Sequence, residues 1–291
     1  DRLADFLATF DDLELIVVPE GDGEVLAPED LARVQGAFFV DLPGTPARRL
    51  LGSVRRAPNL QWLHLGHAGS DAPVFQEMMD RGIVVTNSAG VTAEPIAQSA
   101  IAGLLALNRG IPLWLDAQHR HAWEEHNEAL PRDLAGQTIV VVGLGSIGGQ
   151  LARYARAFGL HVVGVRRTPA TVEDGIDEWL SPDQLREVLP RADVLALTLP
   201  LTQDTRGLID ASAIALLPKG AIVLNVARGQ IIDEVALIEA LRSGQVGGAY
   251  LDVFEEEPLP AESPIWDLPN VIASPHDAGR SAGNDARVDA V

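Results

Sequence analysis

The sequence of 291 residues has no cysteine, a single lysine and no apolar run long enough to span a membrane. The absence of cysteine excludes thiol catalysis, disulfide bonds and zinc sites with cysteine ligands, and it is compatible with a reducing compartment. The longest apolar run, residues 101–107, is far shorter than the roughly 20 residues of a transmembrane helix, and no signal peptide is recognisable. We therefore expect a cytoplasmic protein without a membrane partner.

Basic residues are also scarce, and this limits the partners of the chain. The formal net charge is −19, and nearly all of the positive charge is arginine. Because phosphate backbones are bound by clustered lysine and arginine, this balance argues against nucleic acid as a partner. A chain of this length with 47% hydrophobic residues is expected to fold into two domains, each with its own core.

Short apolar strands alternate with helical segments along the chain. We expect strands at residues 13–18, 37–40, 60–65 and 83–86, and again at 139–142, 161–165, 194–198, 221–225, 248–252 and 270–273. Expected helices include residues 28–33, 46–54, 92–109, 184–189 and 234–242. This alternation predicts an α/β fold of two Rossmann-like, doubly wound parallel-sheet domains with a cleft between them, the first at residues 1–90 and the second at 91–276.

A buried strand followed by three glycines is the most informative stretch of the chain. Four β-branched residues at 139–142 precede Gly143, Gly145 and Gly148 at G-x-G-x-x-G spacing, and a helical pattern then begins. In a dinucleotide site these glycines allow a tight turn, a close approach of the backbone to pyrophosphate and close contact between helix and strand. The start of the helix offers free N–H groups to the phosphates. The stretch predicts that residues 91–276 bind a dinucleotide.

Two arginines follow the next strand, at the position that distinguishes NAD from NADP. In an NAD site an aspartate or glutamate here binds the ribose hydroxyls. This chain has Arg166, Arg167 and Thr168 instead. Because guanidinium groups make bidentate, charge-assisted contacts with phosphate, they favour the 2′-phosphate of NADP. We expect NADP(H) as the preferred cofactor and NAD(H) as a second one; the alternative is an arginine pair exposed to solvent.

Three histidines lie in the polar segment at residues 113–128. His119, His121 and His126 could suggest a metal site. On a helix, however, His119 and His121 point in different directions, and His119 and His126 lie about 10 Å apart along the axis. This spacing does not suit a shared set of ligands. We expect no metal here and interpret the segment as an exposed or interface helix.

Polar residues follow the remaining strands, and three of these runs resemble the signatures of one family. Residues 224–234 (LNVARGQIIDE) are similar to the arginine signature of the D-isomer-specific 2-hydroxyacid dehydrogenases. Residues 252–260 (DVFEEEPLP) resemble their glutamate signature, and residues 270–276 (NVIASPH) resemble their histidine signature. The resemblance extends from about residue 60 to residue 280, with matching order and spacing.

The resemblance implies roles for the residues of these signatures. Arg228 would bind the carboxylate and carbonyl of a 2-oxo acid, and His276 would protonate the carbonyl oxygen as hydride arrives from the nicotinamide. Glu257 would pair with His276, orient its ring and raise its pKa, as a carboxylate beside an imidazole does. Asp252 would accept a hydrogen bond from the nicotinamide carboxamide; the alternative for Asp252 is a cap of the following turn.

Together, the patterns and the resemblance define the expected site. The cofactor residues are Gly143, Gly145, Ser146, Ile147, Gly148, Arg166, Arg167, Thr168, Thr198, Leu199, Pro200, Thr205, Val226, Ala227 and Asp252. Residues 66–71 resemble the family's substrate loop, in which Ala68 and Gly69 would let backbone N–H groups hold the substrate carboxylate. Residues 1–90 would thus be the substrate-binding domain, towards which residues 277–291 return.

Three positions depart from the family pattern. His67 stands where serine is frequent, Gln98 where glutamate is frequent, and Asp277 where an apolar residue commonly follows the histidine. The change at Asp277 places a second carboxylate near His276 and makes the pKa of this histidine harder to predict.

The leading interpretation is an oxidoreductase that transfers a hydride between NADP(H) and a 2-oxo acid or D-2-hydroxy acid, similar to a glyoxylate or hydroxypyruvate reductase. The resemblance also implies a homodimer, with residues 114–123 near the interface. Glu257 argues against a formate dehydrogenase, which has a Gln–His arrangement, whereas a phosphite dehydrogenase stays open because it keeps Arg, Glu and His. The alternative from another class is a nucleotide-sensing, corepressor-like binding protein.

Overall fold

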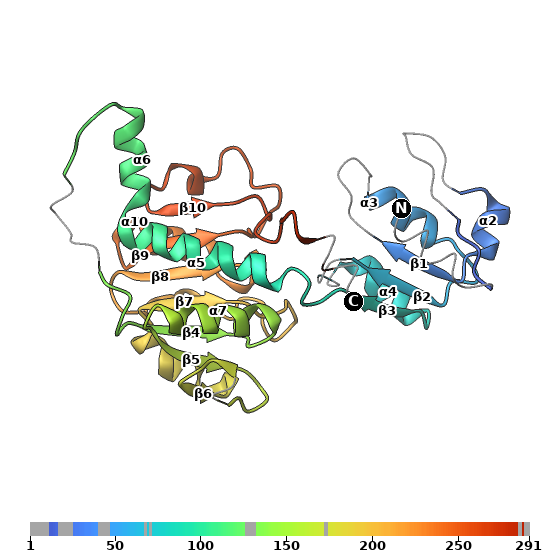
Figure 1. The fold of residues 1–291 in the computed structure, drawn as a ribbon, viewed down its shortest axis with the longest axis horizontal. Helices are drawn as coiled ribbons and strands as arrows, with labels where there is room; N and C mark the ends of the chain where they lie inside the picture. Colours follow the sequence, from blue (N-terminus) through green and yellow to red (C-terminus); the bar gives the residue numbers. More distant parts are fainter. Residues whose placement is uncertain are drawn as a thin grey trace. The chain divides into compact units, whose positions relative to one another are not determined.

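The computed structural model describes residues 12–16, 26–39, 47–66, 69, 72–125, 132–171, 174–284 and 287, with the backbone alone at 47–50. The chain divides into two compact units, one of residues 1–91 with 286–291 and the other of residues 92–285. Both units are α/β structures with parallel strands (Figure 1), which confirms the predicted fold class. Among the described residues, no helix has the length and apolar character needed to cross a bilayer.

The first unit contains a parallel sheet of three strands in the order β1–β2–β3. Its elements are α2 (Pro28–Arg33), β1 (Gly36–Phe39), α3 (Ala47–Val54), β2 (Trp62–Leu65), α4 (Pro73–Asp80) and β3 (Val84–Asn87). Leu63 and Leu65 of β2 are fully buried in one cluster with Phe75 and Met78 of α4. The apolar residues of the central strand therefore form the core of this unit.

Most expected elements of the first unit form within one or two residues of their predicted bounds. The strand expected at residues 13–18 does not: residues 13–16 have no regular secondary structure, and residues 17–18 lie outside the described part of the chain. A strand needs a neighbour to satisfy its backbone groups, and none of the described strands pairs with this segment. The expectations also omit α4, although Pro73 in its first turn is a typical start signal.

The second unit is built on a parallel sheet of seven strands in the order β10–β9–β8–β7–β4–β5–β6. The strands are β4 (Thr138–Val142), β5 (His161–Val165), β6 (Glu178–Leu180), β7 (Val194–Leu197), β8 (Ala221–Asn225), β9 (Val246–Leu251) and β10 (Val271–Ala273). The α-helices are α5 (Ala93–Arg109), α6 (Ile111–His119), α7 (Ser146–Ala157), α8 (Leu185–Val188), α9 (Ala211–Ile214) and α10 (Glu234–Ser243). Short 3₁₀ turns lie at Pro182–Gln184, Leu189–Arg191, Gly229–Ile231 and Pro264–Asp267.

Both faces of the seven-stranded sheet are covered, so the interior of its central strands is apolar. Ile139 and Val141 of β4 join a buried cluster with α5 and α7, which cross one face of the sheet (Figure 1). Val140 and Val142 of the same strand join a second cluster with α8, α9 and α10. A strand with helices on both faces needs apolar side chains at every position, as the run at 139–142 predicted.

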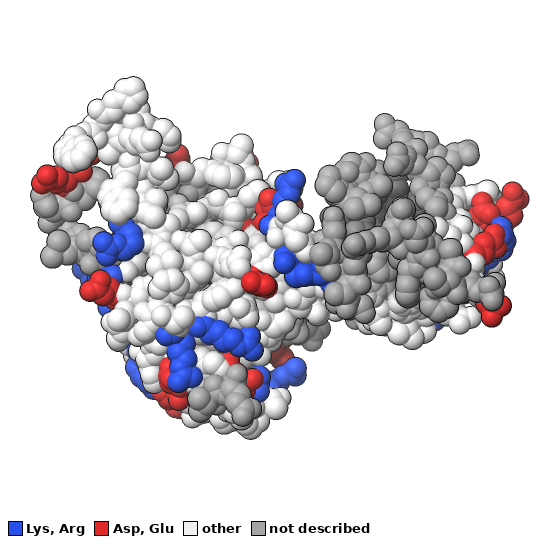
Figure 2. Space-filling model, in the orientation of Figure 1, with Lys and Arg blue, Asp and Glu red and all other residues white. Residues whose placement is uncertain are grey.

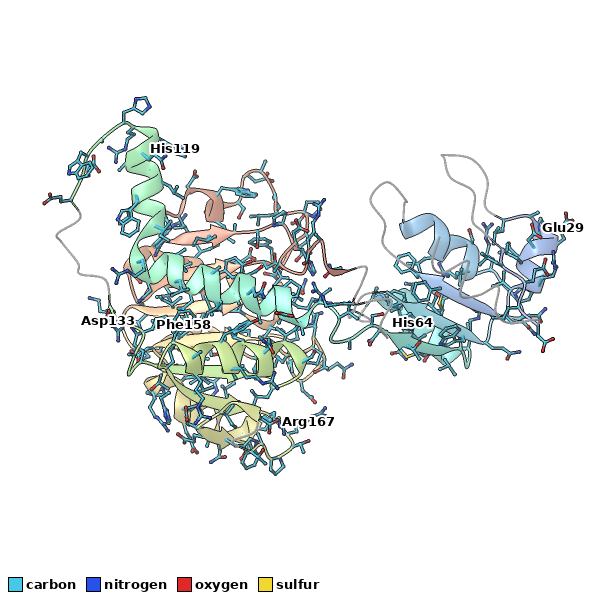
Figure 3. All side chains as sticks on the ribbon, in the orientation of Figure 1. Glu29, His64, His119, Asp133, Phe158 and Arg167 are labelled. Carbon is cyan, nitrogen blue, oxygen red and sulfur yellow. The ribbon has the colours of Figure 1, made fainter. Side chains whose placement is uncertain are left out.

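Helix α6 is shorter than the segment that the sequence suggested. It ends at His119, residues 120–125 are not helical, and His126 lies outside the described residues. Figure 3 shows His119 at the end of this helix, which extends away from the sheet. In the part of the chain that the structure describes, no group of three potential metal ligands is brought together.

The topology of the sheet determines where a ligand is expected to bind. From β4 the chain continues outward through β5 and β6, and it then returns to β7 on the other side of β4. The strand order therefore reverses between β4 and β7. In open parallel sheets, ligands bind beyond the carboxyl ends of the strands at such a switch point. The glycine turn follows β4, and Thr198 follows β7.

Candidate active site

The turn after β4 has a shape that requires glycine. Gly143 has a φ of +96°, and a Cβ atom added to it would lie 2.8 Å from Cα of Leu199. A Cβ atom on Gly148 would lie 2.0 Å from the carbonyl oxygen of Gly143, so helix α7 passes directly against the turn. By contrast, a Cβ atom on Gly145 would meet nothing within 4 Å. The turn is closed against the protein and open at Gly145, where a phosphate can approach.

Helix α7 begins at Ser146, immediately after this turn. No side chain caps its start. The N–H groups in the first turn of a helix have no partner within the helix, and the helix dipole adds partial positive charge, so this end of α7 suits an anion. Ile147 packs against the buried cluster of α5 and α7 and anchors the turn to the core. An open glycine turn and an uncapped helix start fit the pyrophosphate of a dinucleotide.

The predicted cofactor residues after β7 hold the turn in shape. The Thr198 hydroxyl donates to the carbonyl oxygen of Gly143 at 2.5 Å, and its N–H donates to that of Val142 at 3.0 Å. The Thr205 hydroxyl donates to the carbonyl oxygen of Pro200 at 2.7 Å. Both threonine hydroxyls are therefore engaged within the chain. Of the other predicted cofactor residues, Val226 and Ala227 are buried beyond the end of β8.

The two arginines after β5 differ sharply in their surroundings. The Arg166 guanidinium donates to the carbonyl oxygens of Thr168 at 2.7 Å, Pro169 at 2.8 Å and Leu144 at 3.3 Å. It also lies 3.4 Å from a carboxylate oxygen of Asp174. Arg166 thus organises its own loop.

Arg167, on the same loop (Figure 3), is exposed. Its side chain has no hydrogen bond or ion pair with any residue that the structure describes. Thr168 is exposed as well. Of the predicted pair, Arg167 is the guanidinium available to a ligand.

Arg228 lies in a turn that a buried asparagine holds. Asn225, at the end of β8, is fully buried; its amide nitrogen donates to the carbonyl oxygen of Arg228 at 3.1 Å, and its amide oxygen accepts the N–H of Ala227 at 3.1 Å. The Arg228 guanidinium, half-buried, donates to the carbonyl oxygen of Ala227 at 2.7 Å. The expectations omit Asn225, although asparagine after a strand is a common turn signal.

His276 and Glu257, predicted as partners, are in contact. Nδ1 of His276 lies 2.7 Å from Oε2 of Glu257. The other carboxylate oxygen, Oε1, accepts the N–H of Phe254 at 3.0 Å, so both oxygens of Glu257 are occupied. The His276 side chain is 47% exposed, and its Nε2 has no hydrogen bond among the described residues. Because Glu257 accepts the hydrogen bond from Nδ1–H, Nε2 is the atom left to exchange a proton with a ligand.

Hydrogen bonds, burial and nearby charges together set the pKa values of this pair. The hydrogen bond with Glu257 raises the pKa of His276 above its ordinary value, against burial and the positive charge of Arg228. Burial raises the pKa of Glu257, but the hydrogen bonds from His276 and the Phe254 N–H outweigh it, so the net pKa is lowered. Arg228 contributes to both values, which means that the three side chains lie within electrostatic reach of one another.

Asp252 is buried beneath the histidine, at the end of β9. Its carboxylate accepts the N–H groups of Asp277 at 2.9 Å and Ala278 at 3.0 Å. Only 4% of the residue is exposed, and burial raises its pKa against these hydrogen bonds. The carboxylate thus supports the loop after β10, whereas the predicted alternative was a cap of the turn that directly follows Asp252. The carboxylate of Asp277 itself lies 3.7 Å from Arg280 and does not contact the His276 ring.

Residues 66–71, predicted as a substrate loop, belong to the first unit. Gly69 is described and half-buried, whereas Ala68 and His67 lie outside the described residues. Gln98, in the second unit, donates to Glu94 at 3.2 Å and to the Tyr154 hydroxyl at 3.3 Å on the exposed side of α5. Within the second unit, the structure brings His276 into contact with Glu257 and within electrostatic reach of Arg228.

Comparisons with known proteins identify the family of the chain. The family model of the D-isomer specific 2-hydroxyacid dehydrogenase NAD binding domain matches residues 101–278. A glyoxylate reductase of Korarchaeum cryptofilum is 34% identical over 239 residues, 80% of this chain and 70% of that protein. A D-3-phosphoglycerate dehydrogenase of Methanocaldococcus jannaschii is 37% identical over 224 residues, 77% of this chain. The chain spans only 42% of the length of that dehydrogenase.

Solved structures show the same relationship. A D-isomer specific 2-hydroxyacid dehydrogenase from Xanthobacter autotrophicus, in complex with NADPH and MES, superimposes with a TM-score of 0.79 at 33% identity, covering 100% of this chain and 88% of that one. A D-lactate dehydrogenase from Aquifex aeolicus gives a TM-score of 0.74 at 26% identity, covering 90% of this chain and 82% of that one. The three signatures predicted this outcome: the chain belongs to the D-isomer-specific 2-hydroxyacid dehydrogenase family.

Proposed function

We propose that the chain is an NADP(H)-preferring oxidoreductase that interconverts a 2-oxo acid and a D-2-hydroxy acid. The observation that carries the proposal is the contact between His276 and Glu257, with Arg228 in electrostatic reach, in a unit whose sheet edge carries the glycine turn. The relatives named as glyoxylate reductase and the neighbour bound to NADPH support both the substrate class and the cofactor.

Each of the three side chains has a role that its surroundings suit. His276 donates a proton from Nε2 to the carbonyl oxygen, and Glu257 stabilises the charged imidazole until it does so. The planar guanidinium of Arg228 binds the substrate carboxylate and draws charge onto the carbonyl oxygen. NADPH supplies the hydride when it is bound. In the reverse direction the neutral His276 accepts the proton of the hydroxyl group.

A steady-state assay tests the proposal directly. The protein is incubated with NADPH, and in parallel with NADH, and with a panel of 2-oxo acids that includes glyoxylate and hydroxypyruvate. We expect consumption of NADPH with at least one of them. Tight NADPH binding without turnover of any 2-oxo acid would instead favour the nucleotide-sensing protein. Reduction of NADP⁺ by phosphite alone would favour a phosphite dehydrogenase, which the same three side chains also allow.

The contrast between the two arginines predicts how the cofactor is selected. Replacing Arg167 with alanine should lower kcat/KM for NADPH by about 10- to 100-fold, because hydrogen bonds to a charged group are lost, and should leave kcat/KM for NADH unchanged. Arg242→Ala is the matched control, since Arg242 is exposed at the far end of α10. Equal use of NADH and NADPH by the unaltered protein would contradict the preference.

The contact with Glu257 predicts the pH dependence of the reaction. Reduction needs protonated His276, so kcat falls as pH rises through the raised pKa of this histidine. Glu257→Gln removes the negative charge, lowers the pKa of His276, and should move the alkaline limb of the profile to lower pH by about one unit or more. Glu256→Gln removes the same charge from the neighbouring, exposed position. An unshifted limb in Glu257→Gln would argue against the pairing.

The exposed apolar side chains of helix α6 support the proposal of a homodimer. Large apolar side chains on this helix are exposed: Leu113 by 44%, Trp114 by 50% and Leu115 by 49%. Trp123, just beyond it, is 95% exposed. Such a group on a projecting helix is typical of an interface, because isolated soluble surfaces rarely expose contiguous apolar groups.

Mass measurements by light scattering test the dimer. The unaltered protein should have twice the mass of one chain, and the double variant Trp114→Ser, Leu115→Ser should have the mass of one chain. Val235→Ser replaces another apolar side chain that is 66% exposed, on α10, and should leave the mass unchanged. A single-chain mass for the unaltered protein would reject the dimer.

The remaining expectations about partners and location form part of this proposal. The face of the second unit drawn in Figure 2 carries basic side chains beside acidic ones, which does not resemble a nucleic-acid surface. The absence of cysteine suits a reducing cytoplasm.

A further inference from the structure

A chain of hydroxyl groups lies under the loop that carries His276. The Tyr250 hydroxyl, on β9, lies 3.0 Å from the Ser274 hydroxyl, which lies 2.6 Å from Oδ1 of Asp252. The Ser99 hydroxyl, on α5, donates to the carbonyl oxygen of Ala278 at 3.0 Å. We propose that Tyr250, Ser274 and Ser99 are positioning residues that hold residues 274–278 in the conformation in which His276 meets Glu257. Their effect on turnover rests on the proposed function; their effect on the histidine does not.

The loop needs such support because its backbone is unfavourable. His276 has a φ of +54°, in the left-handed region that residues other than glycine rarely adopt. Such a conformation persists only where the surroundings impose it. The N–H of His276 donates to the carbonyl oxygens of Asp252 at 2.9 Å and Ser274 at 3.0 Å. Asp252 and Ser274 therefore hold His276 through their carbonyl oxygens, and their side chains support the loop that carries it.

The number of protons on each group determines which group donates in each of these hydrogen bonds. Oδ1 of Asp252 receives three donors: the hydroxyl of Ser274 and the N–H groups of Asp277 and Ala278. A serine hydroxyl has one proton, and a carboxylate can only accept, so the proton of Ser274 goes to Asp252. The Tyr250 hydroxyl must then donate to the oxygen of Ser274. Removing the hydroxyl of Ser274 or of Tyr250 therefore deprives a buried acceptor of one of its donors.

The ring of Tyr250 is buried and closely packed. Tyr250 is 5% exposed, and a Cβ atom added to Gly103 of α5 would lie only 2.5 Å from its ring. The absence of a side chain at Gly103 thus makes room for the ring between helix and sheet. Burial raises the pKa of Tyr250, so its hydroxyl remains a neutral donor well above neutral pH. A change in a pH profile near neutrality therefore reports on His276 rather than on this tyrosine.

Two hydroxyl deletions test the inference, with Ser274→Thr as the variant that keeps a hydroxyl. Ser274→Ala should lower kcat by about tenfold, the size expected for losing a hydrogen bond to a charged group, and Tyr250→Phe, which removes a hydrogen bond between neutral hydroxyls, should lower it by about three- to tenfold. The KM for NADPH should stay within about twofold, since the glycine turn is unchanged. The alkaline limb of kcat should move to lower pH as His276 spends less time on Glu257. Ser274→Thr should restore both kcat and the limb.

A second measurement does not depend on turnover. The ring protons of His276 are titrated by NMR, with the signal assigned by its absence in His276→Asn. In Ser274→Ala and Tyr250→Phe the pKa of His276 should fall towards its ordinary value. Tyr154→Phe and Ser243→Ala remove comparable hydroxyls from α7 and α10, away from this loop, and should leave the titration unchanged. Ser99→Ala should show a fall like that of the first two variants.

The outcomes separate this inference from the proposed function. Absence of turnover in the unaltered protein rejects the reductase, while a lowered pKa of His276 in the two deletions still supports the positioning role. A lower melting temperature with an unchanged titration of His276 and an unchanged pH profile would mean that the hydroxyls only stabilise the fold, and it would overturn the inference.

Discussion

Replacing His276 with asparagine is expected to lower kcat for reduction of a 2-oxo acid by about 10²- to 10⁴-fold, the range that general acid catalysis contributes. Asparagine cannot exchange a proton, but its amide can still donate to Glu257. It is also among the residues that tolerate a positive φ, so it can adopt the backbone conformation of His276, at +54°. The loss would then reflect proton transfer rather than a displaced loop. The measurement is kcat over a range of pH, with NADPH affinity measured separately.

A second histidine with carboxylate neighbours serves as the matched control. Nδ1 of His161 lies 3.8 Å from Asp177, and its Nε2 lies 3.7 Å from Glu178. His161 begins β5 and therefore lies at the amino-terminal ends of the parallel strands, whereas the glycine turn lies at their carboxyl ends. His161→Asn should leave kcat unchanged. Full turnover in His276→Asn would remove this histidine from the chemistry, whatever its contact with Glu257.

The second unit could be predicted from the sequence because burial on both faces leaves a local pattern. Residues 139–142 are apolar at every position, and each of the two cores takes alternate side chains from them. Helix ends were equally readable: Gly110 and Gly244 close α5 and α10 with φ of 70° and 73°. Strand β6 has no such pattern. It is three half-buried residues at the sheet edge, and it exists through pairing with β5, which a local sequence window does not contain.

The candidate site shows what resemblance gives and what only the fold gives. The resemblance to the family signatures implied roles for Arg228, Glu257 and His276, and each of them follows a strand of one parallel sheet. From their position after β5, Arg166 and Arg167 were equal candidates for binding the 2′-phosphate. In the fold, however, carbonyl oxygens surround Arg166. These oxygens belong to Thr168 and Pro169, two and three residues further along the chain, and they surround Arg166 only because of the conformation of the loop. The periodicity of a sequence indicates burial, but it does not indicate which donor meets which acceptor.

The residues that the sequence analysis missed share one property. Asn225, Ser274 and Tyr250 are polar groups that hold a turn instead of facing a ligand. Asp252, which the sequence analysis did name, has the same property, since its carboxylate receives the N–H groups of the histidine loop. Each lies at or near the end of β8, β9 or β10, next to a predicted catalytic residue. Polar side chains at strand ends can therefore support a site from behind as well as form it, and only three-dimensional contacts distinguish the two.

Replacing Arg228 with lysine is expected to lower kcat/KM for the 2-oxo acid by about 10²- to 10³-fold. Lysine keeps the charge but lacks the planar fork that can bind a carboxylate and a carbonyl oxygen together. Arg191→Lys is the matched control: Arg191 forms a two-point contact with Glu178, at 3.1 and 2.5 Å, away from the glycine turn. This control should cost only a small loss of stability, because the pair is largely exposed.

The pH profile separates the charge of Arg228 from its shape. The positive charge of Arg228 lowers the pKa of His276, so a variant that keeps the charge should keep the alkaline limb of kcat in place. Arg228→Lys should therefore lose kcat/KM without a shifted limb. Arg228→Gln should lose kcat/KM and move the limb to higher pH, because removing a nearby positive charge raises the pKa of the histidine. A lysine variant with full kcat/KM would show that charge alone suffices and that the fork plays no part.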